Sequence, residues 1–190
     1  MSFVTLPDKY TKPAIILHWL IALGILYNLI SMLILDDDAR TASIMQLHKS
    51  VGITVLGLVL LRVLWRAANR PPNLPEAYQP WERTLSHAAH WLLYLMMFAM
   101  PLTGWLMNSA STNKATGQPY PVDLFHVLPW FNLPFFSGMD IAARKGWHEF
   151  FGAGHSFGGW ILLGLLGLHV AGALKHQFLD KEKEFQRMWF

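Results

Sequence analysis

The sequence contains no cysteine and few charged residues. Without thiols, the chain cannot form disulfides, thiolate metal sites, cysteine-ligated iron–sulfur clusters or covalently attached c-type haem. Any metal or cofactor must therefore be bound by histidine, carboxylate or methionine, and nine histidines are present among the 190 residues. Charged residues make up 14% of the chain and hydrophobic residues 53%, a balance that soluble domains of this size rarely have.

The basic residues argue against one class of partner. The formal charge of +3 is modest, and Lys and Arg gather at the ends of apolar stretches instead of forming one basic block. Nucleic acid is therefore not an expected partner, whereas membrane lipid is.

Four apolar stretches are each long enough to cross a bilayer, which takes a helix of about 20 residues. They predict an all-α protein, a transmembrane four-helix bundle that forms one domain over residues 1–190. We expect the helices at about 14–35, 44–65, 85–107 and 150–178. The connection 108–147 is long and rich in proline and aromatic residues, and we expect an ordered outer cap that contains short helices.

Basic residues are unevenly divided between the two sides of this predicted bundle. Ten lie on the side of both termini and five on the opposite side. The first group is Lys9, Lys12, Arg62, Arg66, Arg70, Arg83, Lys175, Lys181, Lys183 and Arg187, and the second is Arg40, Lys49, Lys114, Arg144 and Lys145. Since the positive-inside rule places the more basic side in the cytoplasm, both termini are expected there.

Four histidines lie inside the predicted helices, where an ionisable side chain is a candidate for function. His155 and His169 are 14 residues apart on the fourth helix, so they share one face and lie about 21 Å apart along its axis. His18 enters the first helix from the terminal side, and His48 begins the second from the opposite side. Matching these depths predicts two pairs, His18 with His169 and His48 with His155.

Such pairs indicate a particular kind of cofactor. Neutral imidazole nitrogen binds haem iron axially, and facing helices of a bundle can supply one ligand each. Gly52, one turn after His48, and several glycines on the fourth helix agree with the clearance that a flat porphyrin needs, although small residues also serve close helix packing. We therefore predict two non-covalently bound b haems that carry electrons across the bilayer, with the four histidines as iron ligands.

Longer motifs surround these histidines. They are His18-Trp19, Gln46 to Gly52, His87-x-x-His90, Pro101 to Met107, Gly167 to Phe178 and Arg187-Met188. Together they resemble the motifs of the prokaryotic di-haem cytochrome b561 family over nearly the whole chain. The resemblance implies four helices, the same two ligand pairs, and a multi-pass electron-transport protein of the bacterial inner membrane and respiratory chain.

One motif departs from the family pattern. Many relatives have a His-Glu pair at the outer ligand of the fourth helix, and His148-Glu149 is similar to it. The ligand spacing of the family, 14 residues, selects His155 instead. His148 precedes His169 by 21 residues, about 32 Å along a helix, which is too far to meet His48. We favour His155 and keep His148 as the alternative.

The resemblance also implies a ubiquinone site lined by His90 and His176. An imidazole there would hydrogen-bond a quinone carbonyl and deliver protons when the quinone is reduced. The alternative is that both are interfacial histidines that reach water, the role assigned to His87. Within the family, superoxide oxidation on the periplasmic side is one candidate activity, with ubiquinone as electron acceptor. This reaction needs no nucleophile or general base, so no catalytic residue is predicted.

Other functions use the same features. A membrane cytochrome b subunit would pass electrons between a docked periplasmic redox protein and the quinone pool, with the connection 108–147 as a lid or docking platform. A di-iron enzyme is disfavoured because the histidines lie at two depths. A transporter is disfavoured because no carboxylate lies inside a predicted helix.

Two groups of cations keep two interpretations each. Outer-side cations, namely Lys49, Lys114, Arg144 and Lys145, would attract superoxide or, as we favour, are solvated loop charges. The stripe of Arg62, Arg66 and Arg70 would bind haem propionates or anionic lipid headgroups, and we favour headgroups for Arg66 and Arg70.

Overall fold

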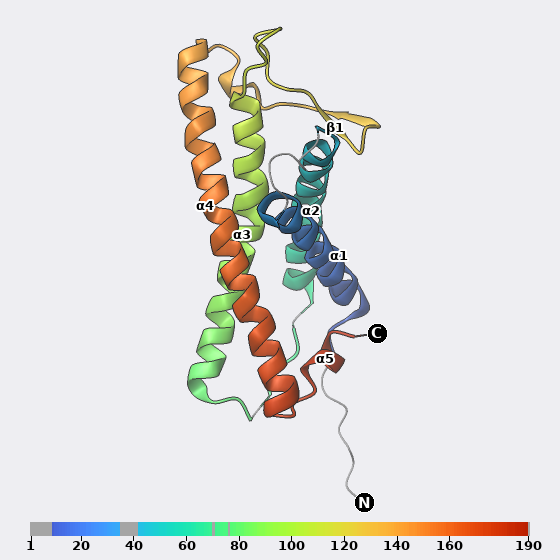
Figure 1. Cartoon of the computed structure of the whole chain (residues 1–190). Helices are drawn as coiled ribbons and strands as arrows, with labels where there is room; N and C mark the ends of the chain where they lie inside the picture. Colours follow the sequence, from blue (N-terminus) through green and yellow to red (C-terminus); the bar gives the residue numbers. More distant parts are fainter. Residues whose placement is uncertain (1–8, 35–41, 70, 76, 190) are drawn as a thin grey trace, which may run out of the picture.

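The computed structural model describes residues 9–34, 42–69, 71–75 and 77–189, and it is dominated by four long helices (Figure 1). They are α1 (Lys12–Leu29), α2 (Ala42–Ala68), α3 (Pro80–Ala110) and α4 (Ile141–Leu174). Short π-helical segments continue α1 over Ile30–Ile34 and α4 over Lys175–Leu179. The smaller elements are strands β1 (Val122–Leu124) and β2 (Leu128–Trp130), the 3-10 turn η2 (Pro134–Phe136) and helix α5 (Glu184–Arg187).

The surface of the bundle is apolar. In the described part of the chain, four helices are long and apolar enough to cross a membrane, with mean hydropathies from 1.2 to 2.0. Large side chains on them point outward: Leu23 is 62% exposed, Trp91 75% and Leu168 71%. Such a surface is stable against lipid and not against water. The predicted transmembrane helical bundle is therefore confirmed.

Helix ends lie beyond the predicted apolar stretches. The third helix, expected from residue 85, begins at Pro80, because Gln79 and Glu82 form a capping box at its start. The fourth, expected from residue 150, begins at Ile141, because the Asp140 carboxylate accepts a hydrogen bond from the Ala143 amide at 2.8 Å. Hydropathy locates the membrane-embedded part, whereas polar capping residues outside it fix the ends.

The helices pack as two neighbouring pairs, α1 with α2 and α3 with α4, joined by contacts between α2 and α3 (Figure 1). The small buried core consists of Ile21, Val55 and Val59, with Met97 and Phe98 packed against it. At one end of the bundle α1 begins beside α5, where the Tyr10 amide donates to the Arg187 carbonyl. We call this the tail end, and the opposite end, which carries β1 and β2, the hairpin end.

The connection between α3 and α4 differs from the prediction. It forms an antiparallel hairpin of β1 and β2 in place of short helices, apart from the three-residue turn η2. Phe125 and His126 at its tip have positive φ values of 52° and 58°, which tighten the turn. The Phe125 amide donates to Ser50 Oγ at 2.9 Å, so the hairpin is anchored on α2. Prolines disfavour helix in this segment.

Gly24 permits the close approach of α1 and α2, and this generates a prediction. A Cβ at Gly24 would lie 2.6 Å from Cγ2 of Val55, a buried and conformationally stiff side chain. Gly24→Ala is therefore expected to destabilise the bundle by about 1–3 kcal/mol, measured by thermal or denaturant unfolding in detergent. Gly57→Ala is the matched control, since nothing lies within 4 Å of its added Cβ. Equal stability of the two variants would contradict this account of the packing.

Candidate functional site

His18 of α1 and His169 of α4 face each other in the half of the bundle nearer the tail end. Their ring centroids are 6.3 Å apart and the rings are inclined at 61°. Two imidazoles bound on opposite sides of one metal ion, at a metal–nitrogen distance of about 2.0 Å, have centroids about 6.3 Å apart. The separation in the structure therefore fits a pair of axial ligands.

His48 of α2 and His155 of α4 form a second pair, nearer the hairpin end. Their centroids are 6.1 Å apart, at 79°. Gly104 of α3 lies against this pair, because a Cβ there would come within 3.1 Å of His155 Cε1. The missing side chain leaves the imidazole room beside α3. The structure thus brings together the same two pairs of histidines that their depths indicated.

Hydrogen bonds leave a ring nitrogen of His155 free for a metal ion. Its Nδ1 lies 3.1 Å from Thr103 Oγ1, and Thr103 Oγ1 donates in turn to the Ala99 carbonyl at 2.7 Å. With Nδ1 carrying the proton, Nε2 keeps its lone pair, the usual arrangement of a histidine ligand. His48 Nδ1 is buried and lacks a hydrogen-bond partner among the described residues. This orphaned nitrogen is consistent with a site built around a bound group.

A cavity of about 250 Å³ lies beside the second pair. His48 and His155 both line it, together with Gly104, Gly159 and the partly buried Lys49. Its walls also include flexible, polarisable side chains, namely Met32, Met45, Met96, Met97, Met100 and Met107. A mostly apolar cavity lined by two imidazoles suits a flat hydrophobic cofactor such as haem.

The two predicted quinone histidines lie in different surroundings. His90 of α3 packs against His169, with centroids 5.5 Å apart, and its Nδ1 lies 2.7 Å from the Ser86 carbonyl oxygen. His176, in the π-helical segment after α4, stacks on Tyr78 with centroids 3.9 Å apart. His90 and His176 therefore have different contacts and do not form one cluster, although both lie toward the tail end.

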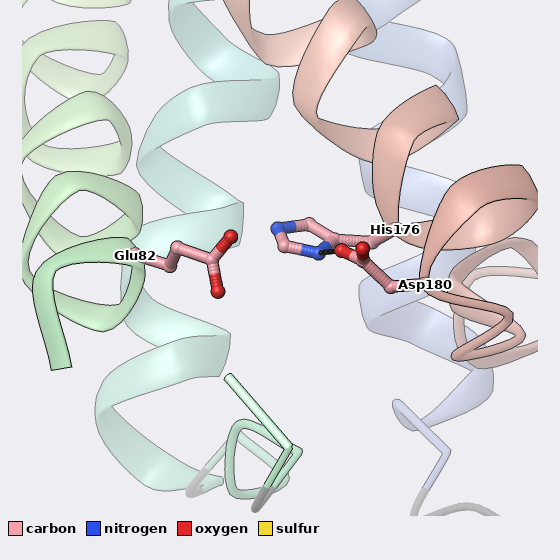
Figure 2. Close-up of side chains that lie close together, drawn as sticks. All are labelled: Glu82, His176 and Asp180. Carbon is pink, nitrogen blue, oxygen red and sulfur yellow. Dashed lines mark hydrogen bonds and ion pairs between the residues drawn. The ribbon is translucent and has the colours of Figure 1, made fainter. Parts of the chain in front are cut away.

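His176 belongs to a polar cluster at the tail end (Figure 2). Its Nδ1 lies 2.7 Å from Asp180 Oδ2, and the Lys175 ammonium group binds both Asp180 and Glu82 at 2.7 Å. The hydrogen bond from Lys175, followed by that from His176, holds the pKa of Asp180 below its ordinary value. Oxygen and nitrogen atoms of Glu82, His176 and Asp180 come within 4.8 Å of one another, as in metal sites, but the Lys175 ammonium group already forms ion pairs with both carboxylates.

The remaining histidines are separate from both pairs. His148 Nδ1 lies 2.9 Å from the Met107 carbonyl oxygen, which joins α4 to α3 near the hairpin end. This contact gives His148 a structural partner of its own. His87 and His126 are exposed.

Arg144 corrects one expectation about the outer cations. It was expected to be a solvated loop charge, but it is only 6% exposed. Its guanidinium group donates to the carbonyls of Gly117 and Ser111, so it organises the connection between α3 and α4. The neighbouring Lys145 is exposed and lies 3.7 Å from Glu149.

Several contacts could not be found from the sequence. Thr103 lies within the motif Pro101 to Met107, but its bond to His155 joins residues 52 positions apart. Likewise, the Trp19 indole donates to the Met188 carbonyl at 2.8 Å, which ties the C-terminal segment to the residue after His18. The motifs contained both residues of this contact, and only the fold brings them together.

The fold and the paired histidines define a class of membrane-embedded helical bundles that hold a cofactor between facing helices. The chain belongs to the prokaryotic cytochrome b561 family, whose sequence profile it matches over residues 9–190. This confirms the resemblance found in the motifs. The protein is thus a membrane electron-transfer protein of a family that uses b-type haem.

Three curated relatives match nearly the whole chain. "Cytochrome b561 homolog 2" of Escherichia coli strain K12 is 33% identical over 99% of this chain and 95% of its own length. "Probable superoxide oxidase CybB" of Yersinia pestis is 26% identical, over 95% of each chain. "Cytochrome b561 homolog 1" of Escherichia coli strain K12 is 23% identical, over 95% of this chain and 97% of its own.

The contacts of Tyr78 generate a second prediction. Its hydroxyl donates to Glu184 at 2.5 Å, and burial together with this bond raises the pKa of Tyr78. Tyr78→Phe leaves the Glu184 carboxylate without this donor at a cost of about 1–3 kcal/mol. We expect faster amide hydrogen exchange in α5, measured by mass spectrometry. Tyr120→Phe, at the hairpin end, should leave α5 unchanged. Unaltered exchange in α5 of Tyr78→Phe would show that this bond does not hold the segment.

Proposed function

We propose that the protein binds two b haems, one between His18 and His169 and one between His48 and His155, and moves electrons from the hairpin end to a quinone at the tail end. The observation that carries this proposal is the pair of ring separations, 6.3 Å and 6.1 Å, which suit axial ligation at two depths. When bound, b-type haem supplies reversible one-electron transfer at its iron. The chain supplies the ligands, excludes water and sets the distance between the sites.

The tail end is the proposed place of quinone reduction and faces the cytoplasm, as the basic residues indicate. Reduction of ubiquinone consumes protons, and His176 bonds to Asp180, which is exposed to solvent. His90 lies against His169 and would face the quinone from α3. A quinone between these elements would receive electrons from the nearer haem site and protons through imidazole groups.

The hairpin end is the proposed place where electrons enter. Lys49 lines the cavity beside His48, and its positive charge would attract an anion such as superoxide. One relative, 26% identical, is named a probable superoxide oxidase, which supports superoxide as the donor. Oxidation of two superoxide ions to two dioxygen molecules releases two electrons, and with two protons these convert ubiquinone to ubiquinol.

A docked redox protein is the second candidate donor. The connection between α3 and α4 exposes Val127 by 85%, Phe131 by 57% and Phe135 by 68%. Exposed apolar groups of this size suit a protein interface or the membrane surface. The protein would then be a cytochrome b subunit that passes electrons from that partner to the quinone pool.

The ligand pairs can be separated by substitution. His169→Ala is expected to remove the tail-end haem and to leave most of the other, so that haem content falls from about two to about one per chain. Pyridine haemochrome spectra and redox titration of the purified protein measure this change. His87→Ala, an exposed histidine on α3, should retain both haems. Two haems in His169→Ala would refute the assignment.

The choice between His155 and His148 has its own test. His155→Ala should lose the hairpin-end haem, whereas His148→Ala should keep it and lose only the contact with the Met107 carbonyl. The quantities to compare are haem content and the midpoint potential of the haem that remains. The reverse result would transfer the ligand role to His148.

A superoxide pulse tests the reaction itself. When superoxide is added to the oxidised protein, we expect the haems to be reduced rapidly, and the change in their absorption bands reports this. Added ubiquinone should then reoxidise the haems. His90→Ala and His176→Ala should slow only the second phase, by about tenfold or more if each supplies acid catalysis. Bands that stay oxidised would support the docked redox protein as donor. Protein without haem bands, produced with ample haem, would overturn the proposal.

A further inference from the structure

A second cavity, of about 230 Å³, lies at the tail end between the start of α1, the end of α2 and the middle of α3. It shares no lining residue with the cavity beside His48 and His155. Three cations line it, Lys9, Arg62 and Arg66, and the described residues around it include no carboxylate. A concave site with this charge is built for an anion.

Arg62 carries most of the argument because it lies within α2, on the membrane-spanning segment. Its Nη1 donates to the Ala14 carbonyl at 2.8 Å and its Nε to the Tyr94 hydroxyl at 3.1 Å. These two bonds fix the guanidinium group but do not neutralise it, and no described carboxylate forms an ion pair with it. A partly buried cation in a membrane helix is costly without a counter-ion.

Arg66 and Trp65, which also line the cavity, are likewise held by contacts with neighbouring helices or segments. The Arg66 guanidinium lies 5.7 Å from the centre of the Tyr94 ring, in a cation–π arrangement that leaves its N–H groups available. The Trp65 indole donates to Thr11 Oγ1 at 2.8 Å and ties α2 to the start of α1. The guanidinium groups of Arg62 and Arg66 are therefore held in place before any ligand binds, which reduces the entropic cost of binding.

We propose that this cavity binds the phosphate of an anionic phospholipid headgroup. Guanidinium groups match phosphate oxygens in geometry, and basic pockets between transmembrane helices on the cytoplasmic side are typical headgroup sites. Leu64, between the two arginines, and Leu61, immediately before Arg62, are 66% and 56% exposed, so acyl chains would find an apolar surface next to the phosphate. This apolar surface favours a lipid over a free oxyanion. The lipid joins α1, α2 and α3 where the described residues offer no carboxylate.

The test uses haem-loaded, delipidated protein in mild detergent and native mass spectrometry. Phosphatidylglycerol and phosphatidylcholine with identical acyl chains are added separately, and the lipid retained per chain is measured. We expect phosphatidylglycerol to be retained preferentially and Arg66→Gln to weaken its retention about fivefold. Lys9→Gln, outside any helix, should act in the same direction without risk to folding. Lys12→Gln, a neighbouring cation outside the cavity, is the matched control and should have no effect.

Four results would overturn the proposal. Equal retention of phosphatidylglycerol and phosphatidylcholine would contradict a headgroup site. Equal retention of phosphatidylglycerol by the Arg66→Gln and wild-type proteins would contradict it as well. Binding of inorganic phosphate that displaces the lipid and depends on Arg66 in the same way would make this a site for soluble oxyanions. A changed haem midpoint potential in Arg66→Gln, with lipid retention unchanged, would instead assign the cations to haem propionates. The first three results leave the haem proposal untouched, so the two proposals fail independently.

Discussion

The meeting of imidazoles from different helices is the constraint on which the rest of the bundle depends. Polar side chains inside a membrane-spanning structure need partners, and His18 and His48 find theirs on one helix, α4. This is possible only because His155 and His169 share a face of α4 and because the side chains of His18 and His48 reach that face from α1 and α2 at two depths. Gly24 brings α1 close to α2, and Gly104 leaves space beside His155. Small residues at these positions let the backbones approach while the imidazoles meet.

The ends of the bundle depend on a second constraint, the satisfaction of polar groups at the limits of the apolar region. Ser50 is fully buried and links α2 to the hairpin, because its hydroxyl accepts from the Phe125 amide and donates to the Gln46 carbonyl. Arg144 does the same for carbonyls of the connection between α3 and α4. At the tail end, Lys175 joins two carboxylates from different elements. The bonds of Ser50 to Phe125, of Arg144 to Ser111 and of Lys175 to Glu82 join residues that are far apart in the sequence, so each fixes the position of a helix end.

These links explain which features the sequence could predict. Hydropathy predicted the four helices because that signal extends over many residues. The 14-residue spacing of His155 and His169, together with the depths of His18 and His48, predicted the two histidine pairs. The hairpin was missed, because its turn places Phe125 and His126, rather than glycine, at positive φ. The surroundings of His176 were also missed. Tyr78, on which His176 stacks, lies 98 positions earlier in the sequence. His176 also lies in a π-helical segment that no residue pattern predicted, and its ring contacts Asp180 there.

The two ends of the bundle differ chemically, and the difference bears on the direction of electron flow. In the hairpin-end pair, the imidazole of His155 is hydrogen-bonded to a hydroxyl, that of Thr103, and the adjoining cavity is mostly apolar. Beyond the other pair, His176 is bonded to a carboxylate that reaches solvent and lies near a second carboxylate and an ammonium group. Oxidation of superoxide releases no proton and needs none, whereas reduction of a quinone takes up two. Under the proposed function, the end with solvent-linked imidazole and carboxylate groups is the one suited to quinone, and electrons that enter beside His48 would leave there.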